Sequence, residues 1–320
     1  MDDFVGTTAE SAAKALYYAA TLVSVGVCAA RWGLCGALDG EPGSIRLHHP
    51  IMSRLSRLGA AAGAVGVVAA LARLLAHTAV ALGLPEALTW NALSRIALDS
   101  QWGSAWRYQV IASVGIALSF LWSARPSWPG WLLATASATS ACVAVGLLGH
   151  AAGNATRVAL HAGHVAGAGV WLGTLAAVVI TTRASSAAQD AGERHRLGDL
   201  DHAVLPWLPT HAAGTRVTML RQFSVVALPG SMLLFTSGAW ASWLYVGSLP
   251  NLMHTAYGQV LVGKLVCVAG VLACGFLNWR RFRAPSGATP RDGTVYVEIA
   301  LAVLVLVITS ILTELAHPGV

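Results

Sequence analysis

Charged side chains are scarce in this sequence. Only 11% of the 320 residues are Asp, Glu, Lys or Arg, whereas 56% are hydrophobic, and the mean hydropathy is +0.63. A soluble globular protein carries about twice that share of charge. This composition therefore excludes a water-soluble fold and predicts a chain that lies in a lipid bilayer, with no room for a large soluble domain in addition.

Three further absences narrow the possibilities. The five cysteines lie in apolar stretches and form neither a CxxC pair nor the spacing of a disulfide framework, so disulfide bonds are not expected. The five methionines form no Met-rich run, which argues against a thioether site for a soft metal ion. The first residues include Asp2, Asp3 and Glu10 in place of the basic start of a secretory signal, so the first apolar helix is expected to be retained.

Eight apolar stretches are long enough to cross a membrane as helices, since a span needs about 20 residues. They occupy approximately residues 12–37, 56–84, 104–122, 130–149, 157–181, 220–247, 256–277 and 295–315. The sequence thus predicts an all-α integral membrane protein, a single bundle over residues 1–320 with consecutive helices antiparallel. Two connections are longer: 86–101 predicts an amphipathic helix on the outer interface, and 182–219 predicts an irregular cytoplasmic loop. Neither shows a catalytic motif, and we expect no enzyme.

The basic residues orient this bundle. Of the 20 Lys and Arg residues, 14 fall in or beside the first, third, fifth and seventh connections, and four fall on the opposite side. Because Lys and Arg accumulate in cytoplasmic connections, the odd connections are expected in the cytoplasm and both termini in the periplasm. The net charge of +6 is therefore interpreted as a topology signal and not as a nucleic-acid interface.

Two histidines in the fifth span mark the candidate functional site. His161 and His164 are three residues apart, and Trp171 follows seven residues after His164. A helix that starts at about residue 158 puts all three side chains on one face. An imidazole is costly in hydrocarbon unless something binds it, so this face is expected to hold a metal ion. The alternative is that the imidazoles only join helices through hydrogen bonds to carbonyl groups.

Further histidines are expected near the same end of the bundle. His150 is separated from the fifth span by Gly153 and Asn154, a turn pair that would let His150 fold back over the helix entrance. It is therefore predicted as a third metal ligand. Weaker candidates, which the topology alone places on the outer side, are Met253, His254 and His317.

Four residues inside other spans are candidates for a transport path beside Trp171. Lys264 and Glu298 carry charges that must be paired or solvated in a membrane, so they form either a structural pair or a proton-carrying group. Cys28 and Cys267 each belong to a pair spaced by seven residues on one helix face. Such thiols could pass a soft metal ion inward by ligand exchange, or they could simply fill helix contacts.

A short similarity links two spans that open from the outer side. Trp102-Gly103 precedes Arg107 at the third span, and Tyr257-Gly258 precedes Lys264 at the seventh. This spacing suggests two four-helix halves in parallel repeat.

Several short motifs occur together along the chain. They are His150, the run from His164 to Gly173, Arg221-Gln222-Phe223-Ser224, Ser237-Gly238, Thr255-Ala256-Tyr257-Gly258, Lys264, Asn278, the run from Gln101 to Arg107, and Glu298. In this combination they resemble the signature of the copper resistance D (CopD) family of inner-membrane copper transport proteins. The resemblance extends over roughly residues 12 to 314.

The resemblance implies a function in copper transport, for copper uptake, homeostasis or resistance. Copper, as Cu(I) or Cu(II), would bind an outward-facing histidine site and cross the bacterial cytoplasmic (inner) membrane. A periplasmic copper-binding protein of the CopC kind is implied as a partner. Two other functions stay open from the residues alone: a b-type haem-binding electron carrier, because bundle histidines also hold haem, and an assembly factor that delivers copper to another membrane enzyme.

Overall fold

The computed structural model describes residues 2–34, 45–124, 127–148, 151–181, 211–283, 292–313 and 315. Eight long helices make up most of this part of the chain. They are α1 (Asp2–Ala29, continued by the π-helix η1, Ala30–Leu34), α2 (Ile45–Leu82), α5 (Gln101–Ser123), α6 (Trp128–Leu147), α7 (Ala155–Ala168, continued by the π-helix η3, Gly169–Gly173, and helical to residue 181), α9 (His211–Val246), α11 (Ala256–Arg283) and α12 (Asp292–Leu312). The connections contain α3 (Leu84–Ala87), α4 (Trp90–Ser94), the π-helix η2 (Arg95–Asp99) and α10 (Leu249–His254).

Most of the long helices are suited to a membrane. Six contain a stretch that is long and apolar enough to span one: Thr8–Leu34, Ile51–Leu82, Trp128–Leu147, Ala155–Thr181, Val225–Val246 and Ala256–Asn278. α12 adds a shorter apolar stretch, Tyr296–Leu312, while α5 includes the polar residues Arg107 and Gln109. Large apolar side chains such as Val68 and Ile111 are exposed, as expected of lipid-facing positions. The expected all-α, multi-span membrane fold is confirmed.

Two connections differ in detail from the sequence-based expectation. The 86–101 segment forms several short helices, because Thr89 caps a new one by accepting a hydrogen bond from the Ala92 N–H (3.3 Å). α9 begins at His211, so it includes the end of the loop expected at 182–219, of which 182–210 lie outside the described residues. With 36 residues, α9 extends over about 54 Å. It is therefore longer than the ~30 Å hydrocarbon core.

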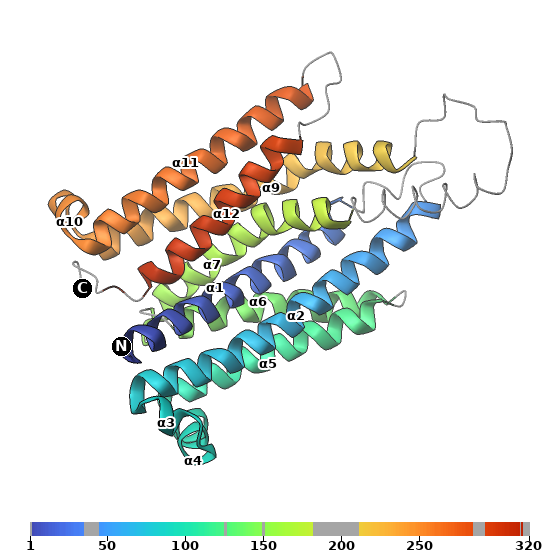
Figure 1. Ribbon diagram of the computed structural model, residues 1–320. Coiled ribbons are helices and arrows are strands. Elements are labelled where there is room, and N and C mark those ends of the chain that lie inside the picture. Colours follow the sequence, from blue (N-terminus) through green and yellow to red (C-terminus); the bar gives the residue numbers. More distant parts are fainter. Residues whose placement is uncertain are drawn as a thin grey trace, which may run out of the picture.

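The long helices form two groups that are consecutive in sequence. α1, α2, α5 and α6 pack together as the N-terminal half, and α7, α9, α11 and α12 form the C-terminal half. The halves meet where α1 packs against η3 and α12, and where α6 packs against α7 (Figure 1). The start of α1, the end of α12 and the short helices α3, α4 and α10 all lie at one end of the bundle, here named the α10 end (Figure 1).

The two halves have the same local structure where their second long helix ends. α2 and α9 are both followed by a glycine with positive φ, Gly83 at 95° and Gly247 at 69°. This conformation strongly favours glycine, and it commonly ends a helix. A short helix with proline in its first turn follows each glycine: α3 contains Pro85 and α10 contains Pro250.

The third long helix of each half also begins in the same way. Ser100 accepts a hydrogen bond from the Gly103 N–H at 2.8 Å, and Thr255 accepts one from the Gly258 N–H at 3.0 Å. Both glycines lie against backbone carbonyls of the preceding short helix, where a Cβ atom would overlap. The shared structure at both helix boundaries supports the parallel repeat suggested by the two aromatic-glycine pairs.

Candidate metal site in the C-terminal half

The helix that carries the candidate histidines begins with a tight turn. Gly153 has a φ of 86°, and the Asn154 side chain caps α7 by accepting a hydrogen bond from the Arg157 N–H at 3.0 Å. The turn expected at this pair is therefore present. His150, the predicted third ligand, lies outside the described residues, as does His317.

His164 is anchored to α9 through one of its two ring nitrogens. Its Nδ1 atom lies 3.1 Å from the Leu234 carbonyl oxygen and 3.1 Å from Ser237 Oγ. The Ser237 hydroxyl donates its own hydrogen to the Leu233 carbonyl at 2.5 Å, so both neighbours of Nδ1 act as acceptors. Nδ1 therefore carries the proton, and the lone pair of Nε2 is available to a metal ion.

Lys264 of α11 lies with His161 and His164 in a group of polar side chains that we name the histidine layer. It interacts electrostatically with both His161 and His164, and the three side chains are half-buried. A Cβ atom on Gly238 would lie 3.0 Å from His164 Cε1, so glycine at this position leaves room for the imidazole. Two imidazoles thus share the layer with one lysine side chain, a combination that the helical spacing of the histidines did not predict.

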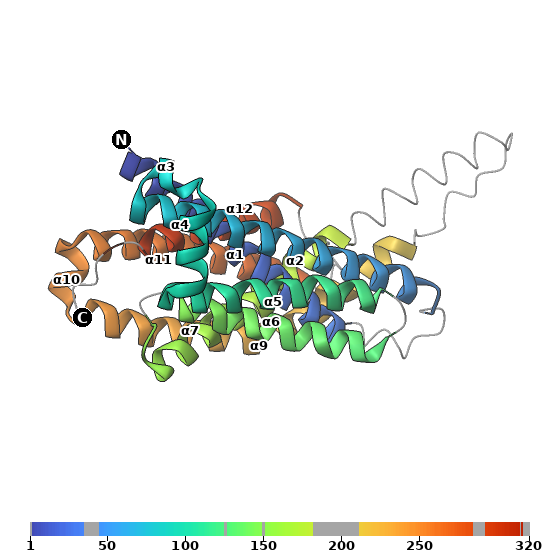
Figure 2. The same cartoon turned by 90° about the horizontal axis from the view of Figure 1, so that it is seen from below.

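The two helices beside this layer pack less closely than the equivalent helices of the N-terminal half. α2 packs closely along α5, whereas the equivalent pair, α9 and α11, make few contacts with each other. α10 joins their ends, and their ribbons otherwise lie apart (Figure 2). The two helices that flank the layer therefore hold each other less tightly than α2 and α5 do.

Trp171 and Glu298 lie deeper in the same half. Trp171 is buried and its ring lies 5.9 Å from that of Phe235. Both Trp171 and Glu298 border Gly275, because a Cβ atom there would be 3.9 Å from the indole and 3.5 Å from Glu298 Oε1. Two of the five residues that were predicted as a path from sequence, Trp171 and Glu298, are therefore close neighbours at this point.

Glu298 is held by polar partners near the end of the bundle opposite α10. It is 2% exposed, and its Oε2 atom accepts a hydrogen bond from Asn278 Nδ2 at 3.2 Å. Thr294 in turn donates to Asn278 Oδ1 at 2.7 Å. Among the described residues no ion pair joins Lys264 to Glu298, so each charge has a separate environment.

The remaining candidates are spread over the molecule. Cys28 is buried in an apolar cluster that joins the two halves, whereas Cys267 is half-buried on α11. α12 contacts both α1, which carries Cys28, and α11. Met253 and His254 are exposed on α10.

Within the described residues, no group of three or more His, Cys, Asp or Glu side chains is arranged to hold a metal ion. The layer offers two imidazoles from one helix, which suits a metal that accepts few ligands. Ser237 was not recognised from the sequence as the residue that orients His164. Ser237 stands ten residues before Gly247, as Arg73 stands ten residues before Gly83. This shared spacing of polar residues is a sequence signal that could have indicated Ser237.

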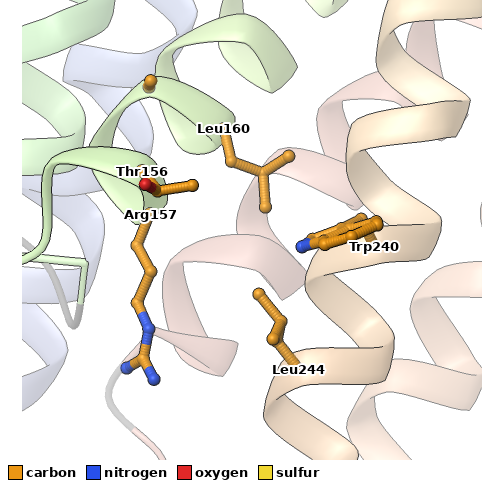
Figure 3. A pocket seen from close by; sticks show the side chains of 6 residues that line it. Thr156, Arg157, Leu160, Trp240 and Leu244 are labelled. Atoms are coloured by element: carbon orange, nitrogen blue, oxygen red, sulfur yellow. The ribbon is translucent and has the colours of Figure 1, made fainter.

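A pocket between α7 and α9 lies beside the layer, toward the α10 end. Leu160, Trp240 and Leu244 converge there, and Arg157 extends away from them (Figure 3). Apart from Thr156 and Arg157, its lining is apolar. An apolar pocket with a cation at its edge does not suit a metal ion, so the histidine layer and not this pocket stays the candidate metal site.

The fold and the buried polar groups define the chain as an all-α, multi-span membrane protein. A family model for the N-terminal domain of copper resistance protein D-like proteins matches residues 5–157, and one for copper resistance protein D matches residues 217–312. The chain belongs to the copper resistance D family. This membership connects it with copper resistance or transport.

The two matches divide the molecule much as the structure does. The first covers the N-terminal half, and the second covers most of α9, α11 and α12. Ser237, Lys264 and Glu298 lie inside the second match, whereas residues 158–216, with both site histidines, lie between the two. No curated protein and no solved structure matches the chain.

Proposed function

We propose that this protein moves copper across the bacterial cytoplasmic membrane through its C-terminal half, with His161 and His164 as ligands. The observation that carries the proposal is the hydrogen bonding of His164. Its Nδ1 atom is engaged by the Leu234 carbonyl and Ser237, which fixes the ring and directs the basic Nε2 atom to a ligand. Family membership supplies the identity of the metal.

The ligand set favours copper in a low coordination number. Two imidazoles are sufficient for Cu(I), which accepts two nearly linear ligands, whereas Zn²⁺ takes four and hard cations prefer oxygen. Additional ligands would come from His150 at the entrance. The nearby Lys264 ammonium opposes a bound cation, so it limits affinity and assists release.

The route continues from the histidine layer toward Glu298. Trp171 separates the two regions, and the Glu298 carboxylate, oriented by Asn278, offers the next anionic group for a cation. Cys28 is less suited to this route than Cys267, because it is buried in an apolar cluster on α1. Copper would thus move by exchange between fixed ligands and not as a free ion.

Copper would be delivered at the α10 end. Met253 and His254 are exposed there on α10, and thioether and imidazole groups are ligands that copper accepts. A periplasmic CopC-like protein is the proposed donor, and the α10 end is then the periplasmic end. In a haem carrier, imidazoles from facing helices would ligate the iron. Here both imidazoles of the layer come from α7, which favours copper.

The test is copper flux into proteoliposomes. Wild-type protein should transport copper, while His164→Ala and His161→Ala should reduce the initial rate at least about tenfold. Thr236→Ala is a matched control, because Thr236 is exposed on α9 and bonds only within its own helix. Equal rates in all four proteins, with folding verified by gel filtration, would contradict the proposal.

A further inference from the structure

A second group of charged side chains lies at the α10 end of the N-terminal half. Glu10, Lys14 and Arg73 are only 7%, 6% and 3% exposed. Lys14 Nζ and Arg73 Nε each lie 3.8 Å from Glu10 Oε1, and His77 Nδ1 lies 3.6 Å from the same oxygen. Two permanent cations thus face one carboxylate, and imidazole is the side chain that changes charge in the physiological range.

Several polar atoms in and beside this group have no hydrogen-bond partner. The three contacts to Glu10 are themselves longer than an N–H···O hydrogen bond of roughly 2.7–3.2 Å, so they are ion-pair contacts. Arg73 Nε, the Tyr17 hydroxyl and both amide atoms of Gln109 have no hydrogen-bond partner in the described part of the chain, although Tyr17 is 1% and Gln109 0% exposed. Buried polar groups of this kind generally bind water. The hydrated region therefore extends inward from Glu10.

The repeat places this group at the same level as the candidate metal layer. Arg73 and Ser237 each stand ten residues before the positive-φ glycine that ends their helix. Gln109 and Lys264 each stand six residues after the capped glycine at the start of theirs. Equivalent positions in the two halves are therefore polar, but the N-terminal group contains a carboxylate beside an imidazole where the C-terminal layer has two imidazoles.

Trp102 holds the imidazole of His77 in place. The two rings are stacked, with centroids 3.9 Å apart and an interplanar angle of 5°. The Arg73 guanidinium also lies over the indole of Trp102, 5.9 Å from its ring centroid, and the face of an indole ring attracts a cation. The His77 side chain is 28% exposed, which gives protons from the solution at the α10 end a way in.

We propose that His77 and Glu10 form a proton-binding site in the N-terminal half, hydrated inward as far as Tyr17. The Nδ1–H group faces the carboxylate, so a proton from solution binds at Nε2 and converts the neutral ring to imidazolium. The Glu10 carboxylate and the Trp102 ring stabilise this charge.

Other charged and titratable side chains surround His77 and Glu10. The cations Lys14 of α1 and Arg73 of α2 oppose protonation, whereas the Tyr17 hydroxyl of α1 and the Cys142 thiol of α6 are neutral. α5 contributes Gln109 and Trp102, which do not titrate. One proton taken up here would accompany copper movement through the other half, a coupling that rests on the function proposed above.

Hydration is tested without copper by hydroxyl-radical footprinting of the purified protein. Tyr17 should be oxidised at a rate typical of a water-contacting residue, whereas Phe120, equally buried at 0% exposure in an apolar cluster, should remain unmodified. Labelling of Tyr17 as slow as that of Phe120 would overturn the hydrated site.

Coupling is tested in proteoliposomes with an internal pH-sensitive dye. His77→Gln should lose proton movement during copper flux, with copper binding unchanged. Glu10→Gln should do the same, but it removes the carboxylate that two buried cations face, so His77→Gln is the decisive variant if Glu10→Gln does not fold. Glu86→Gln, an exposed carboxyl at the same end, is the matched control. Wild-type proton movement in His77→Gln would overturn the proposal. A wild-type protein without copper flux would instead refute the proposed function, and the labelling of Tyr17 would then decide the proton site alone.

Discussion

Gly26 of α1 and Gly173 of η3 lie backbone against backbone at the contact between the two halves. A Cβ atom on Gly173 would overlap the Leu22 carbonyl oxygen, and one on Gly26 would overlap the backbone of Gly173. Thr174 adds a hydrogen bond to the Gly26 carbonyl at 3.3 Å. Small residues allow such close crossings of membrane helices, and this crossing fixes the helix that carries Trp171.

Gly173→Val is therefore expected to destabilise the protein strongly. The added side chain has no space on the α1 side, so the two halves must move apart, at a cost of at least about 3 kcal/mol. Thermal unfolding in detergent measures the effect. Gly263→Val is the matched control, because nothing lies within 4 Å of a Cβ atom there. Equal melting temperatures for both variants would show that the close contact does not hold the halves together.

The orientation in the membrane gives a second prediction. Because the basic residues are concentrated on one side of the predicted bundle, a periplasm-dependent reporter such as alkaline phosphatase should be active when fused at the C-terminus or within α10. The same reporter should be inactive when inserted between residues 182 and 210. Activity in the opposite pattern would place the histidine layer near the cytoplasmic side and reverse the proposed route of delivery.

The sequence predicted features that depend on the spacing along one helix. His161 and His164 were expected on one face because their separation matches the α-helical period. Trp171 lies in the π-helix η3, which this period does not describe. The membrane class followed from hydropathy in the same direct way, and it is confirmed by the long apolar helices. The face that carries the two histidines could thus be predicted from a single stretch of sequence.

Contacts between distant helices could not be predicted in this way. Glu10 and Arg73 are 63 residues apart, and no local pattern specifies that their side chains meet. The electrostatic interaction of Lys264 with the two histidines depends likewise on where α11 lies relative to α7. Because no ion pair joins Lys264 to Glu298 in the described residues, the structural pair considered from the sequence has no support here. The ligand role of His150 stays a prediction.

Ser237 is expected to tune copper binding without touching the metal. Its hydroxyl accepts a hydrogen bond from His164 Nδ1, which orients the ring and keeps Nε2 basic. Loss of such an outer partner typically weakens metal binding about tenfold or more. Ser237→Ala should therefore raise the dissociation constant for Cu(I) by about tenfold in a competition titration. Thr236→Ala should leave it unchanged, and an unchanged value for Ser237→Ala would remove the proposed orienting role.

Lys264 should act in the opposite direction. A half-buried ammonium in the same layer as two imidazoles repels any cation that they bind, and at an effective dielectric constant of about 20 the repulsion between neighbouring charges amounts to a few kcal/mol. Lys264→Met removes the charge with little change in length, so copper should bind about tenfold more tightly or better. Because tighter binding slows release, the flux at saturating copper should fall in the same variant. Lys264→Arg keeps the positive charge and should bind copper as weakly as the wild type. If Lys264→Met bound copper no more tightly than Lys264→Arg, the metal would lie beyond the reach of this charge, and the histidine layer would not be its binding site.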